Sequence, residues 1–480
     1  MVNAQLVVVG GGPGGYAAAF LAADLGLSVA LVDPEANPGG VCVYRGCIPS
    51  KALLHIAKLL AESRHAKAWG IEFGEPTIDL AKLRAFKNGV VGRLTSGTGQ
   101  LVKHRKVQYL QGYAEIVDAH SLKVSLTSGA VESVQFEHAI LATGSLPAMP
   151  PMLKVDDPRV MDSTGALELP DIPKSLLVVG GGYIGLELGS VYAALGSAVT
   201  VVEMTPGLLP GADRDLVDVL ARRITQTMKS VLLETSVVKM KAEAKGIRVT
   251  FEGKGMGGAD QGAAGNDQVF DRVLVSVGRR PNSRIPGLDR TQVQVDQRGF
   301  IMVDEQRRTH EASIFAIGDV VGEPMLAHKA SHEGRVAVEV ITGENVAFTP
   351  RAIPAVVFTD PELAWCGMTE AQAAKENRAV TIAKFPWAAS GRAITLDRTD
   401  GLTKLVIDPD SERLLGVGLV GPGAGELIAE GALAIEMGAN ATDLKLTIHP
   451  HPTLTETMME SAEVFFGQAT HVYKPRKLKT

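Results

Sequence analysis

Two cysteines with four residues between them, Cys42 and Cys47, are the side chains of this sequence whose type and spacing most clearly indicate chemistry. The chain holds only three cysteines, so it does not build a framework of structural disulfides. A close pair in such a chain is typical of thiol–disulfide exchange or of half a zinc site. Zinc would need distant ligands such as His449 and His451, because no second close pair exists. We therefore predict a redox pair and no metal site.

The residues after Cys47 predict a helix, with Pro49 near the first-turn position that proline tolerates. A helix amino terminus stabilises a thiolate, so we expect the pKa of Cys47 to be lowered. Residues five apart on an ideal helix point about 140° apart. A disulfide from Cys42 therefore needs a distorted turn before the helix, which Gly46 could supply. The third cysteine, Cys366, lies in an apolar strand and is predicted to be a small core residue.

Another reactive group stands near the other end of the chain, where Pro450 and Pro452 hold His449 and His451 in an extended segment. A histidine with a carboxylate partner makes a good general base near neutral pH. Glu456 could be that partner. The stretch from Thr453 to Glu456 also fits a helix capping box, which is a purely local role. The residues alone leave both roles of Glu456 open.

A glycine-rich pattern that could position these groups occurs twice along the chain. Both copies are predicted to read strand, glycine turn, helix, strand, acid, which is the first half of a doubly wound parallel fold. The landmarks are the strand 6–9, Gly10, Gly12, Gly15 and Asp33 in the first copy, and the strand 176–179, Gly180, Gly182, Gly185 and Glu203 in the second. Such glycines permit a tight turn, a close approach of pyrophosphate and helix packing. Two matched copies favour two dinucleotide sites over glycine turns that only pack a helix.

The acid that ends each copy bears on which nucleotide is bound. Asp33 and Glu203 can accept hydrogen bonds from ribose hydroxyls, which favours an unphosphorylated ribose. Met204 and Thr205 follow Glu203 with no arginine for a 2′-phosphate, so NAD is predicted at the second site. Asp319, after an apolar strand, could hold a ribityl or ribose hydroxyl, and an ordinary turn aspartate is the alternative. A flavin is the natural partner of the cysteine pair, since it accepts two electrons and passes a hydride to nicotinamide.

Outside the two copies, residues 107–142 are predicted to be rich in strands, and Gly253 to Gln268 to form an extended loop. From Arg351 onward, strands precede helices that begin at about Gly425, which indicates a separate α+β domain.

The composition is that of an ordinary globular protein, with 45% hydrophobic and 21% charged residues. A net charge of −5 gives no reason to expect nucleic acid, and the basic run from Lys474 to Lys479 is expected to be a solvated terminus. No apolar run approaches the roughly 18 residues needed to span a bilayer, and the run 6–9 is too short for a signal peptide. We expect a cytoplasmic protein that binds neither nucleic acid nor membrane.

In these motifs the chain resembles the dihydrolipoyl dehydrogenases of the flavin-dependent disulfide reductase family (class I pyridine nucleotide-disulfide oxidoreductases). The resemblance covers essentially the whole length and is carried by residues 39–54, 277–279, 315–319 and 451–454. It implies a glutathione reductase-like α/β fold with two Rossmann-like dinucleotide-binding domains and a C-terminal α+β dimerisation domain. The implied boundaries are 1–148 for FAD binding, 149–281 for NAD binding, 282–349 for a central domain completing the FAD site, and 350–480 for dimerisation.

The resemblance also implies a role for each candidate residue. Cys42 would exchange with substrate and Cys47 would face the flavin. Lys51 would lie near the flavin N5 and pair with Glu187, for which a solvated helix position is the alternative. FAD would be held by Gly10, Gly12, Gly15, Asp33, Gly40, Val41, Cys42, Lys51, Ala114, Thr143, Gly144, Asp319 and Ala327. NAD would be held by Gly180, Gly181, Gly182, Tyr183, Ile184, Gly185, Glu203, Val237 and Gly278.

By the same resemblance His451, oriented by Glu456, would be the catalytic base and would come from the partner subunit of an obligate homodimer. This favours the catalytic role of Glu456 over the capping role. The implied reaction oxidises a protein-bound dihydrolipoyl group to lipoyl and reduces NAD⁺ to NADH. The implied partner is a lipoylated acyltransferase of a 2-oxo acid dehydrogenase complex, or the glycine-cleavage carrier protein, with its subunit-binding domain. We expect the acyl carrier to be another chain.

Two positions depart from the family pattern. Tyr44-Arg45 replaces a smaller, uncharged pair, and Arg45 would either lower the thiolate pKa further or face solvent. Tyr183 occupies a position that is often aliphatic in this family but holds a gating tyrosine in glutathione reductases. In this chain Tyr183 could cover the empty nicotinamide pocket.

Other functions fit less well. Mercuric reductase should carry a C-terminal cysteine pair, glutathione reductase should use NADPH, and a soluble transhydrogenase would not need Cys42 and Cys47. The intact cysteines and base disfavour a structural or lipoyl-binding subunit without catalysis.

Overall fold

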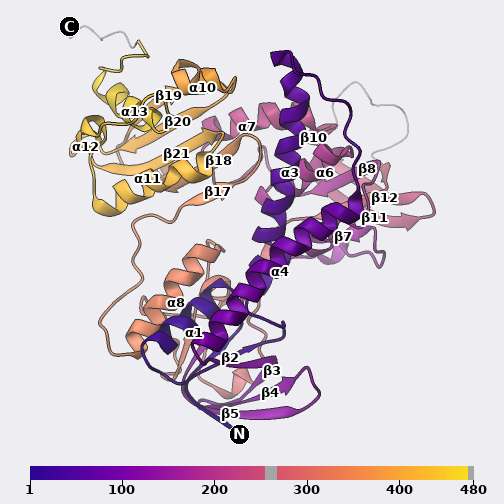
Figure 1. The fold of residues 1–480 in the computed structure, drawn as a ribbon, viewed down its shortest axis with the longest axis vertical. Coiled ribbons are helices and arrows are strands. Elements are labelled where there is room, and N and C mark those ends of the chain that lie inside the picture. The colour runs from indigo at the N-terminus through magenta and orange to yellow at the C-terminus, as the bar shows by residue number, and fades with distance from the viewer. Residues whose placement is uncertain (255–266, 474–480) are drawn as a thin grey trace.

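The computed structural model describes residues 1–254 and 267–473, and Figure 1 shows them as three regions. The N-terminal region lies at the bottom of that view, the second fingerprint region at the upper right and the C-terminal region at the upper left. Each region is built on its own sheet, and helices pack on these sheets. The predicted α/β class with an added C-terminal domain is therefore confirmed.

The first sheet carries the first glycine fingerprint. Its strands are β1 (Val2–Val9), β2 (Val29–Asp33), β3 (Gln108–Asp118), β4 (Ser121–Leu126), β5 (Val131–Leu141) and β16 (Ile314–Ala316). β1 pairs in parallel with β2 and β5, with Leu6 opposite Val29 and His138, and β16 extends the sheet beyond β5. All of β2 is buried, as expected of a parallel strand covered on both faces. The predicted strand-rich stretch 107–142 is confirmed.

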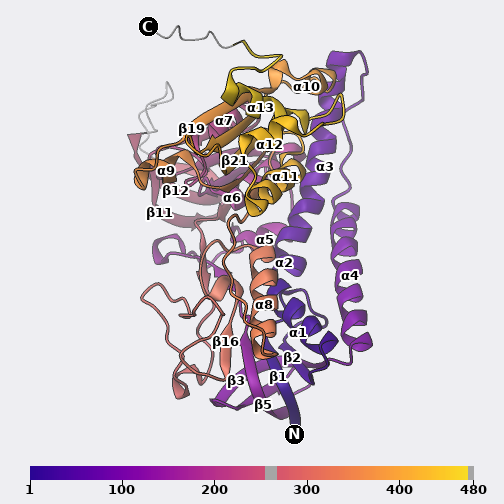
Figure 2. The ribbon, with the colours of Figure 1, turned by 90° about the vertical axis from the view of Figure 1, so that its left-hand side faces the viewer.

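Two helices that are about 300 residues apart in the sequence lie side by side on this sheet, α1 (Pro13–Asp24) and α8 (Ala327–Ile341) (Figures 1 and 2). Glycine makes their close contact possible, because a Cβ on Gly14 would lie 2.9 Å from the carbonyl oxygen of Ala330. The chain thus returns to the first region after it has built the second.

The cysteines lie where two helices meet, α2 (Gly40–Arg45) and α3 (Cys47–His65). Cys47 is the first residue of α3, as predicted. Gly46 turns the chain between the helices, and a Cβ there would lie 2.9 Å from the carbonyl oxygen of Val41. This tight turn keeps Cys42 close to Cys47. The long helix α4 (Leu80–His104) runs beside α3 (Figure 2).

The second sheet is parallel and carries the second fingerprint. Its strands, in spatial order, are β10 (Ser230–Leu232), β9 (Ala198–Val202), β8 (Ser175–Val179), β14 (Arg272–Val275) and β7 (Val160–Met161). The helices of this region are α5 (Ser163–Leu167), α6 (Tyr183–Leu195) and α7 (Arg214–Thr227). A short antiparallel pair, β6 (Ser145–Pro147) with β15 (Arg279–Pro281), joins the second region to the first.

An antiparallel sheet of β11 (Thr235–Glu243), β12 (Gly246–Gly253) and β13 (Asp267–Phe270) completes the second region. The predicted loop from Gly253 to Gln268 is wrong at both ends, because Gly253 ends β12 and Asp267 begins β13. Val249 pairs with Gln268 there, so cross-strand hydrogen bonds override the polar composition. The rest of that stretch, 255–266, lies outside the described residues.

The C-terminal region has an antiparallel sheet and several helices. The strands in spatial order are β17 (Ala355–Val357), β18 (Glu362–Gly367), β21 (Leu414–Gly421), β20 (Leu402–Ile407) and β19 (Thr381–Pro386). The helices are α9 (Glu370–Lys375), α10 (Gly391–Thr395), α11 (Ala424–Met437), α12 (Ala441–Leu446) and α13 (Glu456–Phe466). Cys366 is buried in β18 and packs in the core, as predicted. The predicted solvated terminus from Lys474 to Lys479 lies outside the described residues.

A buried lysine fastens the C-terminal region to the second region. Lys404 on β20 is 1% exposed, and its Nζ lies 2.7 Å from Asp213 and 3.0 Å from Asp215, at the start of α7. Glu370 of α9 also pairs with Lys404. Close packing continues beside this cluster, because a Cβ on Gly418 would lie 2.4 Å from Cδ1 of Leu216. Among the helices that the structure describes, none is long and apolar enough to cross a membrane.

Candidate active site

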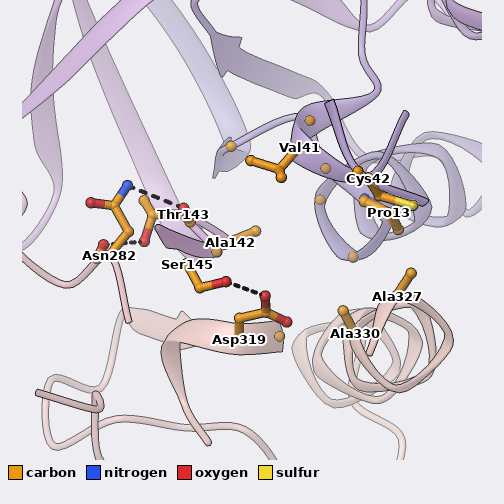
Figure 3. Close-up of a pocket in the computed structure, with 18 of the residues that line it drawn as sticks. Pro13, Val41, Cys42, Ala142, Thr143, Ser145, Asn282, Asp319, Ala327 and Ala330 are labelled. Atoms are coloured by element: carbon orange, nitrogen blue, oxygen red, sulfur yellow. Dashed lines mark hydrogen bonds between the residues drawn. The ribbon is translucent and has the colours of Figure 1, made fainter. Parts of the chain in front are cut away.

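A cavity of about 590 Å³ opens beside the cysteines and runs between the first and second regions. Its walls come from the β1–α1 turn, the ends of β2 and β5, helices α2 and α3, the amino end of α6, and the start of α8. Figure 3 shows part of this lining, including Pro13, Cys42 and Ala327. Every residue that we expected to hold FAD lines this one cavity: Gly10, Gly12, Gly15, Asp33, Gly40, Val41, Cys42, Lys51, Ala114, Thr143, Gly144, Asp319 and Ala327. The two cysteines lie on the same wall.

The glycine turn can receive a pyrophosphate. Gly10 has a φ of +106°, and a Cβ there would lie 2.3 Å from the carbonyl oxygen of Ala142. A Cβ on Gly15 would lie 1.8 Å from the carbonyl oxygen of Gly10. The amino end of α1 therefore stays open toward the cavity, with its backbone N–H groups free to meet negative charge. These features fit a dinucleotide.

The two fingerprint acids, Asp33 and Glu203, each accept hydrogen bonds from the backbone of the neighbouring glycine turn. Asp33 accepts hydrogen bonds from the backbone N–H of Gly11 at 2.5 Å and of Glu35 at 2.9 Å. Burial raises the pKa of Asp33 despite these bonds. Glu203 likewise accepts from Gly181 at 2.7 Å and from Thr205 at 2.8 Å. This local role was missed in the sequence, where both acids were interpreted only as ribose acceptors.

The two thiols differ in their readiness to ionise. Both are free, with Cys42 half-buried and Cys47 exposed toward the cavity. A hydrogen bond from the Cys42 thiol, together with the Lys51 ammonium, outweighs burial and lowers the pKa of Cys47 to about 7. The same hydrogen bond, with burial, raises the pKa of Cys42. Cys47 is thus the thiolate of the pair, as expected, with its partner thiol as the largest cause.

Lys51 is held by an ion pair that crosses between regions. Its Nζ lies 2.9 Å from Oε2 of Glu187 on α6. Glu187 is only 3% exposed, so a solvated helix position is the wrong interpretation of this residue. The backbone N–H of Phe358 donates to the other carboxylate oxygen at 3.0 Å. The pair predicted from the family resemblance is therefore present in the structure.

The second fingerprint lies mostly outside the cavity. Tyr183 and Ile184 reach the cavity wall from the amino end of α6. Burial raises the pKa of the Tyr183 phenol to about 12. The other expected NAD residues surround the carboxyl ends of β8, β9 and β14 and the start of β11: Gly180, Gly181, Gly182, Gly185, Glu203, Gly278 and Val237. In parallel sheets this edge is where nucleotides bind.

His451 and Glu456 form the expected pair. Nδ1 of His451 lies 2.9 Å from Oε1 of Glu456, and Oε2 of Glu456 accepts from the backbone N–H of Thr453 at 2.7 Å. Burial opposes ionisation, but these two bonds hold the pKa of Glu456 below its usual value. Helix α13 begins at Glu456 with Thr455 as its N-cap, so the predicted capping box from Thr453 does not form, and the Thr453 hydroxyl donates instead to the carbonyl of Pro450. The carboxylate of Glu456 orients the His451 ring, and its catalytic role stays a prediction.

The histidine is exposed and stands apart from the cysteines. The side chain of His451 is 75% exposed, and the residues lining the cavity, as far as the structure describes them, do not include His451 or Glu456. One chain therefore does not bring the base to the redox pair within this cavity.

The departure at Tyr44 and Arg45 has a structural explanation. Arg45 pairs with Glu35, beyond the end of β2. The Tyr44 hydroxyl donates to the carbonyl of Asn37 at 3.0 Å. Neither alternative offered from the sequence describes Arg45, because it is engaged in an ion pair and Lys51 is the cation that lowers the pKa of the thiols. The two residues tie the segment between the cysteines to the end of β2.

Three polar residues of the cavity, Ser145, Arg279 and Asn282, were missed in the sequence, and they support the predicted Asp319 and Thr143. Ser145 donates to Oδ2 of Asp319 at 2.5 Å, and Arg279 donates to the Ser145 hydroxyl at 2.7 Å. Thr143 and Asn282 exchange two hydrogen bonds through their backbone carbonyls, at 2.8 and 3.2 Å (Figure 3). Only Arg279 had a signal, because it belongs to the motif 277–279. The others are joined across the β6–β15 pair and leave no local pattern.

Comparison with known proteins agrees with this geometry. Residues 4–334 match the pyridine nucleotide-disulphide oxidoreductase family model, and residues 353–462 match its dimerisation domain. The chain belongs to the pyridine nucleotide-disulphide oxidoreductase family. Members of this family use FAD and NAD(H), so both predicted cofactors are confirmed.

Within the family, dihydrolipoyl dehydrogenases are among the curated proteins of similar sequence. The chain is 48% identical to that of Haemophilus influenzae, covering 98% of this chain and 96% of the relative. It is 47% identical to that of Vibrio parahaemolyticus, covering 100% and 99%. The predicted resemblance is confirmed.

Solved structures show the same fold. LpdA of Mycobacterium tuberculosis aligns with a TM-score of 0.87 at 27% identity, covering 96% of this chain and 99% of that one. A Cu(II) complex of the HOCl-induced flavoprotein disulfide reductase RclA of Escherichia coli aligns with a TM-score of 0.85 at 27% identity, covering 97% and 100%. The glutathione reductase-like fold class is confirmed.

The C-terminal region exposes the apolar surface that a dimerisation domain requires. On α11, Leu433 and Met437 are 63% and 78% exposed. Leu446 ends α12 at 71% exposure, and Ile448, just before the histidines, is 95% exposed. Large exposed apolar side chains are typical of a protein interface. The dimerisation domain supports the predicted homodimer, and Ile448 lies three residues before His451.

Proposed function

We propose that this protein oxidises protein-bound dihydrolipoyl groups to lipoyl groups and reduces NAD⁺ to NADH. One observation carries the proposal: a thiol pair, with Cys47 poised as the thiolate, opens into a cavity lined by every residue expected to hold FAD. The dihydrolipoyl dehydrogenases of similar sequence support the choice of substrate.

The chain's own groups fit both cofactors. For FAD, the open amino end of α1 would meet the pyrophosphate, and Asp319, held by Ser145, would meet the ribityl chain. For NAD, the second glycine turn and Glu203 would meet the pyrophosphate and the adenosine ribose. Bound FAD would accept the two electrons of the reduced cysteine pair and return them as a hydride to NAD⁺.

The thiol chemistry begins with Cys42 and Cys47 joined as a disulfide. His451 of the partner subunit has Nδ1 engaged with Glu456, so its Nε2 can take the proton of a substrate thiol. The resulting thiolate attacks Sγ of Cys42, a mixed disulfide forms, and the Cys42–Cys47 bond breaks. Cys47 leaves as a thiolate, which Lys51 stabilises.

The second substrate thiol then completes the exchange. Its sulfur attacks the substrate sulfur of the mixed disulfide and the bond to Cys42 breaks, so the lipoyl disulfide closes. The proton of this second thiol passes to the departing Cys42 sulfur, while the first proton stays on His451 until it is released to solvent. Two electrons have now passed from the substrate to the cysteine pair. A leaving thiol of low pKa departs faster, so the asymmetry between Cys42 and Cys47 favours the first step.

The position of His451 bears on the number of subunits that the proposed active site requires. His451 lies outside the cavity of its own chain, so the proposed active site needs two subunits. The acyl carrier is proposed to be a lipoylated acyltransferase or the glycine-cleavage carrier protein, and the subunit-binding domain of such a complex is the proposed dock. A cytoplasmic location stays a prediction.

Replacing the thiol that meets substrate tests the proposal. Cys42→Ser should keep bound flavin and lose turnover of dihydrolipoamide with NAD⁺, because no mixed disulfide can form. Cys366→Ala removes the buried third thiol and serves as the matched control, with activity near that of the wild type. Flavin absorbance and NADH production are the measurements. Undiminished turnover by Cys42→Ser would contradict the proposal.

A further inference from the structure

Phe358 lies where three regions of the molecule meet. The centroid of its ring is 4.4 Å from Nζ of Lys51, which belongs to α3 of the first region. Its backbone N–H donates to Glu187, which belongs to α6 of the second region. Phe358 itself follows β17 of the C-terminal region. One aromatic residue therefore contacts both members of the ion pair beside the cysteines.

The position of Phe358 is fixed on both sides along the chain. Val357 before it is buried and pairs with Leu363 across β17 and β18. Asp360 after it lies 2.7 Å from Arg398. The ring packs against the apolar cluster shared by α3 and α6. The face that it presents to Lys51 is thus held by the surrounding structure.

We infer that Phe358 is a positioning residue that holds the Lys51 ammonium beside Cys47. The inference rests on the proposed function, since it concerns the thiolate that the mechanism uses. Glu187 alone would leave a flexible lysine free to turn its charge toward water, and the Lys51 side chain is 32% exposed. The ring adds an attraction on another side of the ammonium, and such contacts strengthen away from solvent.

The consequence for Cys47 follows from charge. Lys51 is a cation that lowers the pKa of Cys47, whereas Glu187 raises it. Loss of the ring would let the ammonium move outward, where water and salt screen it, while Glu187 stays. The thiolate would then form at higher pH.

The test is a pH titration of the NADH-reduced holoenzyme without oxygen, following the long-wavelength absorption that a thiolate gives beside a flavin. In the wild type the midpoint should lie near 7. Phe358→Leu should raise it by about half a pH unit, whereas Phe358→Tyr, which keeps the ring face, should match the wild type. Phe358→Met fills the site without a ring and should behave as Phe358→Leu does.

The matched control removes an aromatic ring from another lysine–ring contact, far from the cysteines in the sequence. Nζ of Lys445 lies 4.9 Å from the ring centroid of Phe466, in the C-terminal region. Phe466→Leu should leave the midpoint unchanged. Trypsin supplies a second reading, because it cuts after Arg45 and so separates Cys42 from Cys47 into different peptides. The pH midpoint of iodoacetamide labelling at Cys47, measured in the peptide 46–51, should shift in the same direction as the midpoint of the absorption.

A double substitution separates positioning from packing. If Phe358 acts through Lys51, Phe358→Leu should add no shift in a Lys51→Met background. An unchanged midpoint in both Phe358→Leu and Phe358→Met, or an equal shift in Phe358→Tyr, would overturn the inference. A wild type without any pH-dependent thiolate signal would instead count against the proposed function itself.

Discussion

At the scale of single residues, the chemistry depends on which charged group faces which sulfur. Lys51 acts on the thiols, while Arg45, although closer in sequence to Cys47, is engaged by Glu35. Sequence spacing predicted the cysteine pair and the histidine–carboxylate pair, because their members are near neighbours along the chain. It could not predict the Phe358 contact, because three distant segments create it.

The base gives a prediction at this scale. His451→Gln should lower dihydrolipoamide turnover by about a hundredfold or more, because the substrate thiol loses its proton acceptor. Electron transfer from NADH to an acceptor without thiols should persist, since it needs no base. The measurements are the steady-state rates of dihydrolipoamide oxidation by NAD⁺ and of NADH oxidation by the acceptor without thiols.

His471→Gln is the control, because His471 also pairs with a carboxylate, Glu460, in the same region. It should keep both activities. Equal loss of both activities in His451→Gln would show that the substitution damages more than proton transfer.

At the scale of elements, the two fingerprints could be predicted because each is local: a strand, a turn of glycines and a helix follow one another directly. The completion of the first sheet could not. β16 and α8 come from beyond residue 310 and pair with β5 and α1, and no sequence period records such a return. The sequence around Asp319 showed a strand and an acid, but not the sheet to which they belong.

A buried carboxylate on α8 helps to hold the segment of β16 and α8 on the first sheet. Glu333 is fully buried, accepts the backbone N–H of Gly318 at 2.6 Å and pairs with Arg307 at 3.0 Å. Lys329 lies 3.2 Å from the same carboxylate. The network supports the backbone immediately before Asp319, and thereby the wall of the FAD cavity.

Glu333→Gln should therefore destabilise the fold and weaken flavin retention. It leaves the buried Lys329 and the half-buried Arg307 without their anion, and breaking a buried pair typically costs about 3–5 kcal/mol. Thermal unfolding and the ratio of flavin to protein after gel filtration are the measurements. Glu339→Gln, at a half-buried position of the same helix, is the control. Wild-type values for Glu333→Gln would mean that the network does not support the cavity.

At the scale of the whole molecule, we predict that the exposed side chains of Leu433, Met437, Leu446 and Ile448 contribute to the dimer surface. Its match to a dimerisation domain could not be derived from hydrophobic spacing alone, because exposed and buried apolar positions look alike in one sequence. Two proposed active sites arise only when this surface is covered.

Ile448→Asp should shift the protein toward monomers, because it places an unpaired carboxylate in an apolar interface. Dihydrolipoamide turnover should fall with the loss of dimers, while NADH oxidation by a non-thiol acceptor should persist. Sedimentation or light scattering reports the assembly. Met152→Asp, at a 65% exposed apolar position of the second region, should change neither. A dimeric, fully active Ile448→Asp variant would contradict this assignment.

The ion-pair cluster of Lys404 with Asp213, Asp215 and Glu370, at the start of α7, affects whether part of this protein can be expressed alone. Asp213 pairs with Lys404, and Asp215 pairs with both Lys404 and Lys384; the chain adds these two lysines more than 160 residues later. A fragment ending at residue 281 would carry two adjacent carboxylates facing each other without those cations, and Leu216 would lose the backbone it packs against. The nucleotide-binding half is therefore expected to be a poor candidate for separate expression, and it gains its final packing only after residues 404 and 418 have been synthesised.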